Sequence, residues 1–149
     1  MKNNKGLSLI EIIIVIGILS LIISLGLVVD LSFLKNDILK TESSTIVSNL
    51  EKARNLAMNN MFESPHGFCY RKPNYIIFRD GPGTRCVEGA STNQIVPANI
   101  NISQNPNTTF PNVIIFSQLA GTTTPASIKL SDGIKSLDIN VNSEGTIEW

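Results

Sequence analysis

The sequence of 149 residues predicts an α+β fold, in which a long N-terminal helix, transmembrane and then amphipathic, packs on a small antiparallel β-sheet domain. The first observation behind this prediction is an apolar segment at residues 7–29, in which Glu11 is the only charged residue. The second is a stretch without proline or glycine at residues 30–61, where apolar residues recur at helical spacing. The third is the change, over residues 62–149, to short β-rich runs separated by Gly, Pro, Asn and Ser.

The apolar segment is long enough for a membrane helix. Residues 12–29 form an uninterrupted run of 18 residues without a charge, and a spanning helix needs about 20 predominantly apolar residues. Lys2 and Lys5 precede the segment, so residues 1–6 are expected to form a cytoplasmic leader. A cleavable secretory signal would have a shorter apolar core, of roughly 7–15 residues, and a small-x-small site after it. We therefore expect a single-pass inner (plasma) membrane protein with a cytoplasmic N-terminus.

The stretch at residues 30–61 is expected to continue the helix as an amphipathic segment. Its apolar residues recur at steps of 7, 4, 3, 4 and 4, which places them on one helix face. Together with the apolar segment it could form one continuous helix over residues 7–61, about 80 Å long at 1.5 Å per residue. One half would bury its surface against lipid or other subunits, and the other half against the domain that follows. The apolar residues on the expected face are Leu39, Ile46, Leu50, Ala53, Ala57 and Met61.

Residues 62–149 are expected to form an extracytoplasmic β-rich globular domain. A domain of this size is near the lower limit for burying its own core, so it is expected to lean on the amphipathic helix. Turns are expected at residues 72–74 and 142–145, and a long loop at residues 80–97. Strands are expected at residues 67–71, 75–79, 99–103, 113–118, 127–130, 137–141 and 146–149.

Glu11 is the first candidate functional residue. A charged side chain at the centre of a membrane helix costs roughly 2.5–3.5 kcal/mol on insertion scales. Glu11 therefore needs a compensating role, the alternative being a side chain near the headgroups that reaches toward water. It ends the string Lys5-Gly6-Leu7-Ser8-Leu9-Ile10-Glu11.

This string resembles the processing site of type IV prepilins and type II secretion pseudopilins. The resemblance implies that a prepilin peptidase cuts after Gly6 and methylates the new α-amino group of Leu7. Most of the family has phenylalanine where this chain has Leu7. The resemblance also implies that Glu11 compensates this amine during assembly, in its own subunit or in a neighbour's. An ammonium and a carboxylate are tolerable in hydrocarbon only when they are paired.

The same resemblance implies a pilin-like fold and a structural role as a filament subunit, with no enzymatic activity and no cofactor. The partners would be other pilin or pseudopilin subunits, the prepilin peptidase, an inner-membrane assembly platform and membrane lipid. The chain resembles in particular the GspH/FimT-type minor pseudopilins, which implies a minor subunit at or near the filament tip. This closer likeness is carried by residues 50–57, by a strand ending at Phe116, by Gly121, by residues 128–130, and by residues 137–147 with Gly145 among them.

Gly17, Ser20 and Ser24 lie at positions i, i+3 and i+7 of the expected membrane helix. Small residues at this spacing let neighbouring helices approach closely in a bundle. The alternative is that each serine is satisfied by its own helix backbone.

Cys69 and Cys86 are the only cysteines, and both fall in the exported domain. An oxidising compartment favours a disulfide between them, which would contribute about 3 kcal/mol on the chain-entropy model. Two buried thiols are the alternative. His66 is the only histidine and lies in an expected loop without a C-x-x-C motif nearby, so no metal site is expected.

No catalytic residues are expected, because the sequence contains no hydrolase elbow, phosphate loop or paired catalytic carboxylates. The net charge is 0, with 12 basic and 12 acidic residues, which gives no reason to expect nucleic acid as the main partner. Two alternatives stay open: a minor pilin that binds DNA during uptake, and an uncleaved single-pass membrane protein. The residues that would form a basic patch for DNA near the first hairpin are Arg71, Lys72, Arg79 and Arg85.

Overall fold

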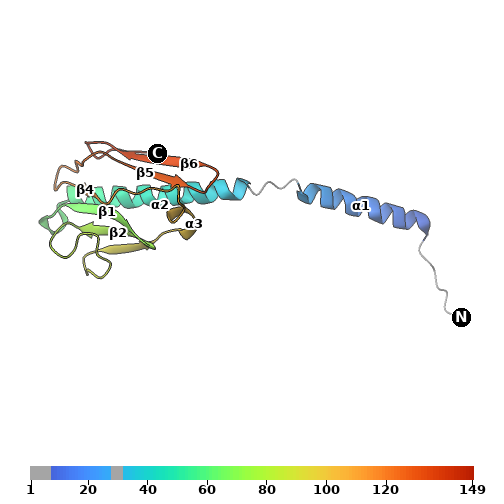
Figure 1. The fold of residues 1–149 in the computed structure, drawn as a ribbon, viewed down its shortest axis with the longest axis horizontal. Coiled ribbons are helices and arrows are strands. Elements are labelled where there is room, and N and C mark those ends of the chain that lie inside the picture. The colour runs from blue at the N-terminus through green and yellow to red at the C-terminus, as the bar shows by residue number, and fades with distance from the viewer. Residues whose placement is uncertain (1–7, 28–31) are drawn as a thin grey trace. The chain divides into compact units, whose positions relative to one another are not determined.

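Figure 1 shows the computed structural model, which describes residues 8–27 and 32–149. The chain divides into two compact units, Met1–Leu34 and Lys35–Trp149, and each is described by itself. The expected leader at residues 1–6 and the expected junction at residues 29 and 30 lie outside the described residues. The continuity of one helix over residues 7–61 therefore stays a prediction.

The described part of the first unit is a helix, α1 (Leu9–Leu27). Ile and Leu dominate its sequence, and every side chain from residue 8 to residue 24 is exposed in the single chain. Among the residues that the structure describes, no helix combines the length and the apolar character needed to cross a membrane. The described residues omit both ends of the segment 7–29, so the prediction for this segment is confirmed only as a helix.

The second helix, α2 (Ser32–Met58), confirms most of the expected amphipathic pattern. Met61 is the exception, because the helix ends before it and its side chain is exposed in the short 3-10 turn η1 (Met61–Glu63). Asn60, between the two, has a left-handed φ of 54°, a conformation in which asparagine is enriched and which ends the helix. The buried apolar residues of α2 are Leu39, Ile46, Val47, Leu50, Ala53 and Ala57.

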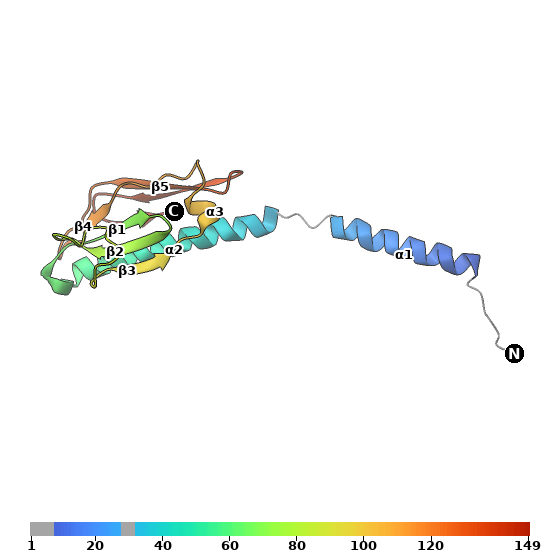
Figure 2. The same cartoon turned by 60° about the horizontal axis from the view of Figure 1, so that its bottom comes forward.

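The β region forms two antiparallel sheets (Figure 2). Six of the seven expected strands are present. The first sheet has the order β3-β2-β1-β4 and the second the order β5-β6-β7. The strands of the first sheet are β1 (His66–Arg71), β2 (Asn74–Arg79), β3 (Gln94–Pro97) and β4 (Ile114–Phe116). Those of the second are β5 (Ala126–Ser131), β6 (Ser136–Val141) and β7 (Ile147–Glu148).

Two segments differ from the expectation. Residues 99–103 were expected to be a strand, but they form the short helix α3 (Ile100–Ser103). The side chain of Asn99 accepts a hydrogen bond from the backbone N–H of Asn101 and so caps this helix. Strand β3 lies within the expected loop at 80–97 and pairs with β2.

Both expected turns are present. Lys72 and Pro73, joined by a cis peptide bond, connect β1 and β2. At the other turn, the side-chain oxygen of Asn142 accepts hydrogen bonds from the backbone N–H groups of Glu144 (3.0 Å) and Thr146 (2.9 Å). These bonds hold the hairpin between β6 and β7 in register.

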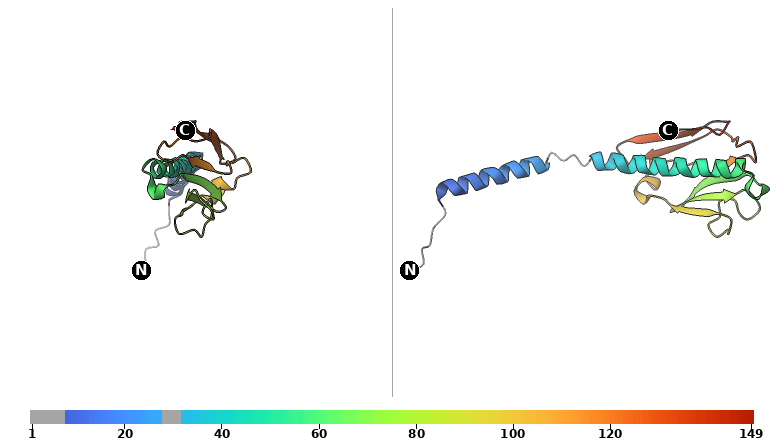
Figure 3. Two further views of the ribbon diagram at one scale, coloured as in Figure 1. Left: turned by 90° about the vertical axis from the view of Figure 1, so that its left-hand side faces the viewer. Right: turned by 180° about the vertical axis from the view of Figure 1, so that it is seen from behind.

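Helix α2 and both sheets share one hydrophobic core. The right-hand view of Figure 3 shows strands on either side of α2. The first sheet contributes its inner face to this core, including Phe68, Tyr75 and Ile77. Its opposite face forms a second, smaller cluster around Cys69, with Ile76, Phe78 and Cys86. The β region therefore leans on the helix as expected, and its main core includes residues of the second sheet, namely Ile128, Leu130, Ile139 and Val141.

Candidate functional site

Glu11 lies in the first turn of α1, and its carboxylate reaches back toward the start of the helix. Its Oε2 accepts a hydrogen bond from the backbone N–H of Ser8 at 2.9 Å. The carbonyl of Ser8 in turn accepts from the N–H groups of Glu11 (3.0 Å) and Ile12 (3.3 Å). Ser8 and Glu11 match the capping-box pattern S-x-x-E, a sequence signal for this arrangement that the expectations above did not include.

The described contacts of Glu11 are those of a residue that caps its own helix. Its pairing with an amine at Leu7 stays a prediction. A helix N-terminus also favours a negative charge. Gly6 and Leu7 themselves lie outside the described residues, and their roles stay predictions.

The surface around Glu11 is apolar and, in the single chain, uncovered. Leu9 is 76% exposed, and Ile10, Ile12 and Val15 are more than 45% exposed. A large exposed apolar surface marks a site that contacts lipid or other proteins. A carboxylate within such a surface would lose its water on docking, so it would need a cationic partner there.

The three small residues of α1 all lie on its exposed surface. The hydroxyl of Ser20 donates to the carbonyl of Ile16 at 2.8 Å. This is the hydrogen bond to its own helix backbone that was the alternative to helix packing. A Cβ added at Gly17 would meet no atom within 4 Å, so this glycine leaves open space on the helix surface. Ser24 is also exposed. Close helix packing at Gly17 and Ser24 stays a prediction.

Residues 1–27 match the prokaryotic N-terminal methylation motif. The match supports a relationship to type IV prepilins and pseudopilins and indicates a type IV pilin-like protein that a prepilin peptidase processes. It includes Gly6, Leu7, Glu11 and all of α1. A search of curated proteins and a search of solved structures each found no match.

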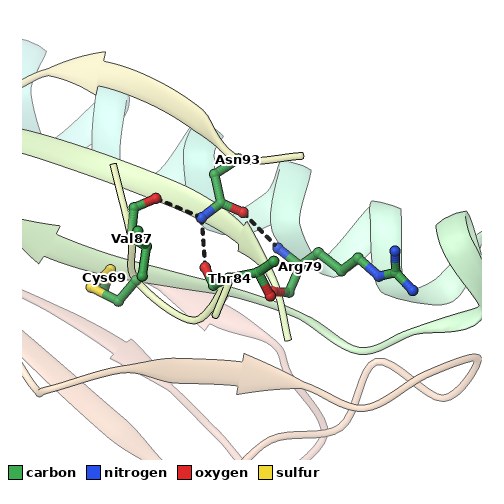
Figure 4. The surroundings of a disulfide bond; sticks show 6 residues. Cys69, Arg79, Thr84, Val87 and Asn93 are labelled. Carbon is green, nitrogen blue, oxygen red and sulfur yellow. Dashed lines mark hydrogen bonds between the residues drawn. A yellow bond between two sulfur atoms is a disulfide. The ribbon is translucent and has the colours of Figure 1, made fainter. Parts of the chain in front are cut away.

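In the globular unit, Cys69 and Cys86 form a disulfide with a Cα–Cα distance of 6.0 Å. It ties the loop that follows β2 to the outer face of the first sheet. Figure 4 shows Asn93 in the surroundings of the disulfide, with its amide nitrogen donating to the carbonyls of Thr84 (2.6 Å) and Val87 (2.8 Å). The disulfide and Asn93 therefore hold the same loop from two sides.

We expect native protein to contain no free thiol. Both cysteine side chains are buried and are joined in a disulfide, so alkylation before reduction should add no mass to the intact chain. Reduction in denaturant followed by alkylation should add two labels. Two labels without reduction, on protein recovered from its native compartment, would show that the bridge does not form there.

The four basic residues of the DNA-binding alternative differ in their contacts. The guanidinium of Arg85 makes a bidentate contact with Asp80, at 2.5 Å and 2.9 Å, and this hydrogen bond and charge raise the pKa of Arg85. The guanidinium of Arg79 lies 5.6 Å from the ring centre of Phe62. Arg71 and Lys72 are exposed at the first hairpin. Two of the four cations are thus already engaged within the domain.

His66 is buried at the start of β1, not in a loop as expected. Its Nδ1 lies 3.0 Å from the carbonyl of Ser64. Burial is the main cause that lowers the pKa of His66, with a smaller contribution in the same direction from Arg79. The ring is therefore neutral at pH 7. The described residues contain no group of three or more His, Cys, Asp or Glu side chains that could hold a metal ion.

Proposed function

We propose that this chain is a structural subunit of a type IV pilus or a type II secretion pseudopilus, and that α1 mediates its assembly into the filament. The main support is the methylation motif at residues 1–27. It contains an exposed apolar helix with the carboxylate of Glu11 in its first turn. In this proposal, the peptidase cuts after Gly6 and methylates Leu7. Helices α1 of many subunits then bury one another's apolar surfaces in the filament core.

Before assembly, the subunit is anchored in the inner membrane by residues 7–29, with its N-terminus in the cytoplasm. Lys2 and Lys5 on one side of the apolar run support this orientation. The disulfide supports an oxidising, extracytoplasmic environment for the globular unit. Other subunits, the prepilin peptidase, the assembly platform and lipid are the partners that this function requires.

We propose further that the subunit is a minor one of the GspH/FimT type. Three segments that carry the likeness meet at one place in the globular unit. Arg54 donates from Nη2 to the carbonyl of Glu144 at 3.2 Å. A Cβ on Gly145 would lie 3.0 Å from Nε of Arg54, and one on Gly121 would lie 2.7 Å from Cγ of Met58. Glycine at both positions therefore fits the close approach of two turns to the end of α2.

The cleavage site provides the test of this function. Replacing Gly6 with leucine should leave a full-length precursor in the membrane, because it places a bulky side chain where Gly6 presents none to the peptidase. The mature form should fall by about tenfold or more, equivalent to about 1.4 kcal/mol in the free energy of the cleavage transition state. Intact mass and N-terminal sequencing of membrane fractions measure the ratio of precursor to mature protein.

Asn4→Leu is the matched control, since it places the same side chain two residues upstream and should be processed normally. Native wild-type protein should begin at Leu7. An N-terminus at Met1, or one beyond Val29, would support an uncleaved membrane protein or a different export route and would overturn the proposal.

A further inference from the structure

A cavity of about 620 Å³ lies on the globular unit, where three separate segments of the chain meet. We call it the Arg71 cavity. Its volume falls within the roughly 300–1,000 Å³ typical of sites for small ligands, so it has room for a small organic molecule. Its walls include Tyr70 and Arg71 from β1, Arg85 and Cys86 from the loop after β2, and Ser103 and Phe110 from α3 and the segment that follows it.

The loop that forms one wall of the Arg71 cavity is fixed by several contacts. The disulfide ties Cys86 to Cys69 on β1, and the amide of Asn93 donates to the carbonyls of Thr84 and Val87. Cys86 has a φ of 55°, in the left-handed region that residues other than glycine rarely adopt. Such conformations persist only where surrounding contacts fix them, and they cluster at binding sites. A wall that is already fixed loses little conformational entropy when a ligand binds.

Arg71 gives the lining of the cavity one uncompensated positive charge. Its guanidinium is exposed and, in the part of the chain that the structure describes, takes part in no hydrogen bond or ion pair. Arg85, the second charged residue of the lining, is already paired with Asp80. A free guanidinium offers two parallel N–H groups that match the two oxygens of a carboxylate. The charge therefore suits a single anionic group, whereas nucleic acid needs several free cations for its phosphates.

The rest of the lining offers an aromatic wall and a hydroxyl donor. The rings of Tyr70 and Phe110 are stacked, with their centres 4.5 Å apart. The hydroxyl of Ser103, a residue only 5% exposed, accepts a hydrogen bond from the hydroxyl of Tyr70 at 3.2 Å. The proton of the Ser103 hydroxyl has no acceptor among the described residues. A ligand with an aromatic ring and an acceptor oxygen would use both features.

We propose that the Arg71 cavity binds a carboxylate that is joined to an aromatic body, with the carboxylate on the guanidinium of Arg71 and the ring against Tyr70 and Phe110. This chemistry has two sources, namely the C-terminal residue of a peptide and a free aromatic acid. The inference goes beyond the proposed function and does not rest on it, because the cavity belongs to the globular unit, whereas cleavage and assembly are assigned to residues 6–27. It gives the globular unit a ligand of its own.

Calorimetric titration of the full chain in a non-ionic detergent tests this site. The probes are the peptide acetyl-Ala-Ala-Phe with a free C-terminus, the same peptide as its C-terminal amide, and 3-phenylpropionate. The free peptide should bind about tenfold or more tightly than its amide, because the amide cannot make the charged bidentate contact. Tighter binding of the peptide than of 3-phenylpropionate identifies a peptide C-terminus as the source. Equal binding of the two identifies the free acid as sufficient, and both results support the site.

Arg71→Met should weaken the binding of both acids by about tenfold or more, since it removes the charged partner of the carboxylate from an exposed position. Lys72→Met is the matched control. It removes the same charge from the next residue, which is also exposed but does not line the cavity, and binding should change by no more than about twofold because exposed charges are screened.

Three results would overturn the proposal. The first is no binding of either acid to the wild type, and the second is equal affinity for the free peptide and its amide. The third is an equal loss of binding in Arg71→Met and Lys72→Met, which would indicate a general basic surface. Displacement of the peptide by a DNA duplex whose affinity falls equally in the two variants would likewise overturn the site, in favour of the DNA-binding alternative.

Discussion

Glu11→Ala is expected to be inserted and cleaved like the wild type but to be about tenfold or more depleted from filaments. Removing the charge makes the apolar segment more hydrophobic, so membrane insertion should not suffer. In the filament the amine of Leu7 would lose its carboxylate, and breaking a buried ion pair by removing one partner costs about 3–5 kcal/mol. Tagged Glu11→Ala, expressed with its assembly system, should stay in the membrane fraction after filaments are sheared off. Recovery in filaments at the wild-type level would show that the charge is dispensable.

Glu11→Gln separates two roles of this side chain. Glutamine retains an oxygen that can accept from the Ser8 amide, as Glu11 does at 2.9 Å, but it has no charge. If charge pairing with the Leu7 amine controls assembly, Glu11→Gln should be depleted from filaments as strongly as Glu11→Ala. If the helix cap is what matters, Glu11→Gln should assemble nearly normally, since glutamine at this position retains the cap.

The helix and most strands could be predicted because their patterns are local. The apolar residues of α2 repeat at helical spacing. The strands are short β-rich runs, bounded by the residues Gly, Pro, Asn and Ser that favour turns. Residues 99–103 also alternate, as Asn-Ile-Asn-Ile-Ser, and this pattern is typical of a strand. The helix α3 forms instead because the side chain of Asn99 caps it. In addition, the backbone N–H of Asn99 donates to the carboxylate of Glu42, which lies 57 positions earlier in the chain. Such a long-range contact leaves no local signal.

Strand β3 was missed for a related reason. Its four residues lie in a segment rich in glycine and proline, and its pairing is set by β2, with Val96 opposite Tyr75. At the candidate site, Glu11 could be singled out because a charge in an apolar run is conspicuous. The sequence gives no such contrast for Glu42, which lies among Thr41, Ser43 and Ser44 and looks like part of a solvated helix face.

Glu42 is nevertheless only 6% exposed, and it connects three elements. Its Oε1 accepts hydrogen bonds from the hydroxyl of Tyr75 on β2 (2.6 Å) and from the backbone N–H of Asn99, before α3 (2.9 Å). Burial, followed by the hydrogen bond and charge of Glu42, raises the pKa of Tyr75 far above its ordinary value. The hydroxyl therefore stays a donor to the carboxylate across the physiological pH range.

Glu42→Ala should lower the free energy of unfolding by about 2–6 kcal/mol. It leaves two donors at this buried site without their acceptor, each costing about 1–3 kcal/mol. Glu51→Ala is the matched control, because Glu51 is exposed on the same helix and its replacement should stay within about 0.5 kcal/mol. Denaturant unfolding of the full chain in detergent measures both values. Equal stability of the two variants would show that the Glu42 contacts contribute nothing.

The titration of Tyr75 gives an independent readout of the same contacts. A raised pKa means that the stabilisation linked to this group is complete below its unfolded value near pH 10 and is lost as the pH rises through the folded value. Glu42→Ala removes the hydrogen bond and the charge that contribute to this rise, so Tyr75 should ionise at lower pH than in the wild type. Tyr75→Phe identifies its signal in an absorbance titration. An unchanged Tyr75 titration in Glu42→Ala would mean that burial alone keeps this hydroxyl protonated, and that Glu42 is not coupled to it.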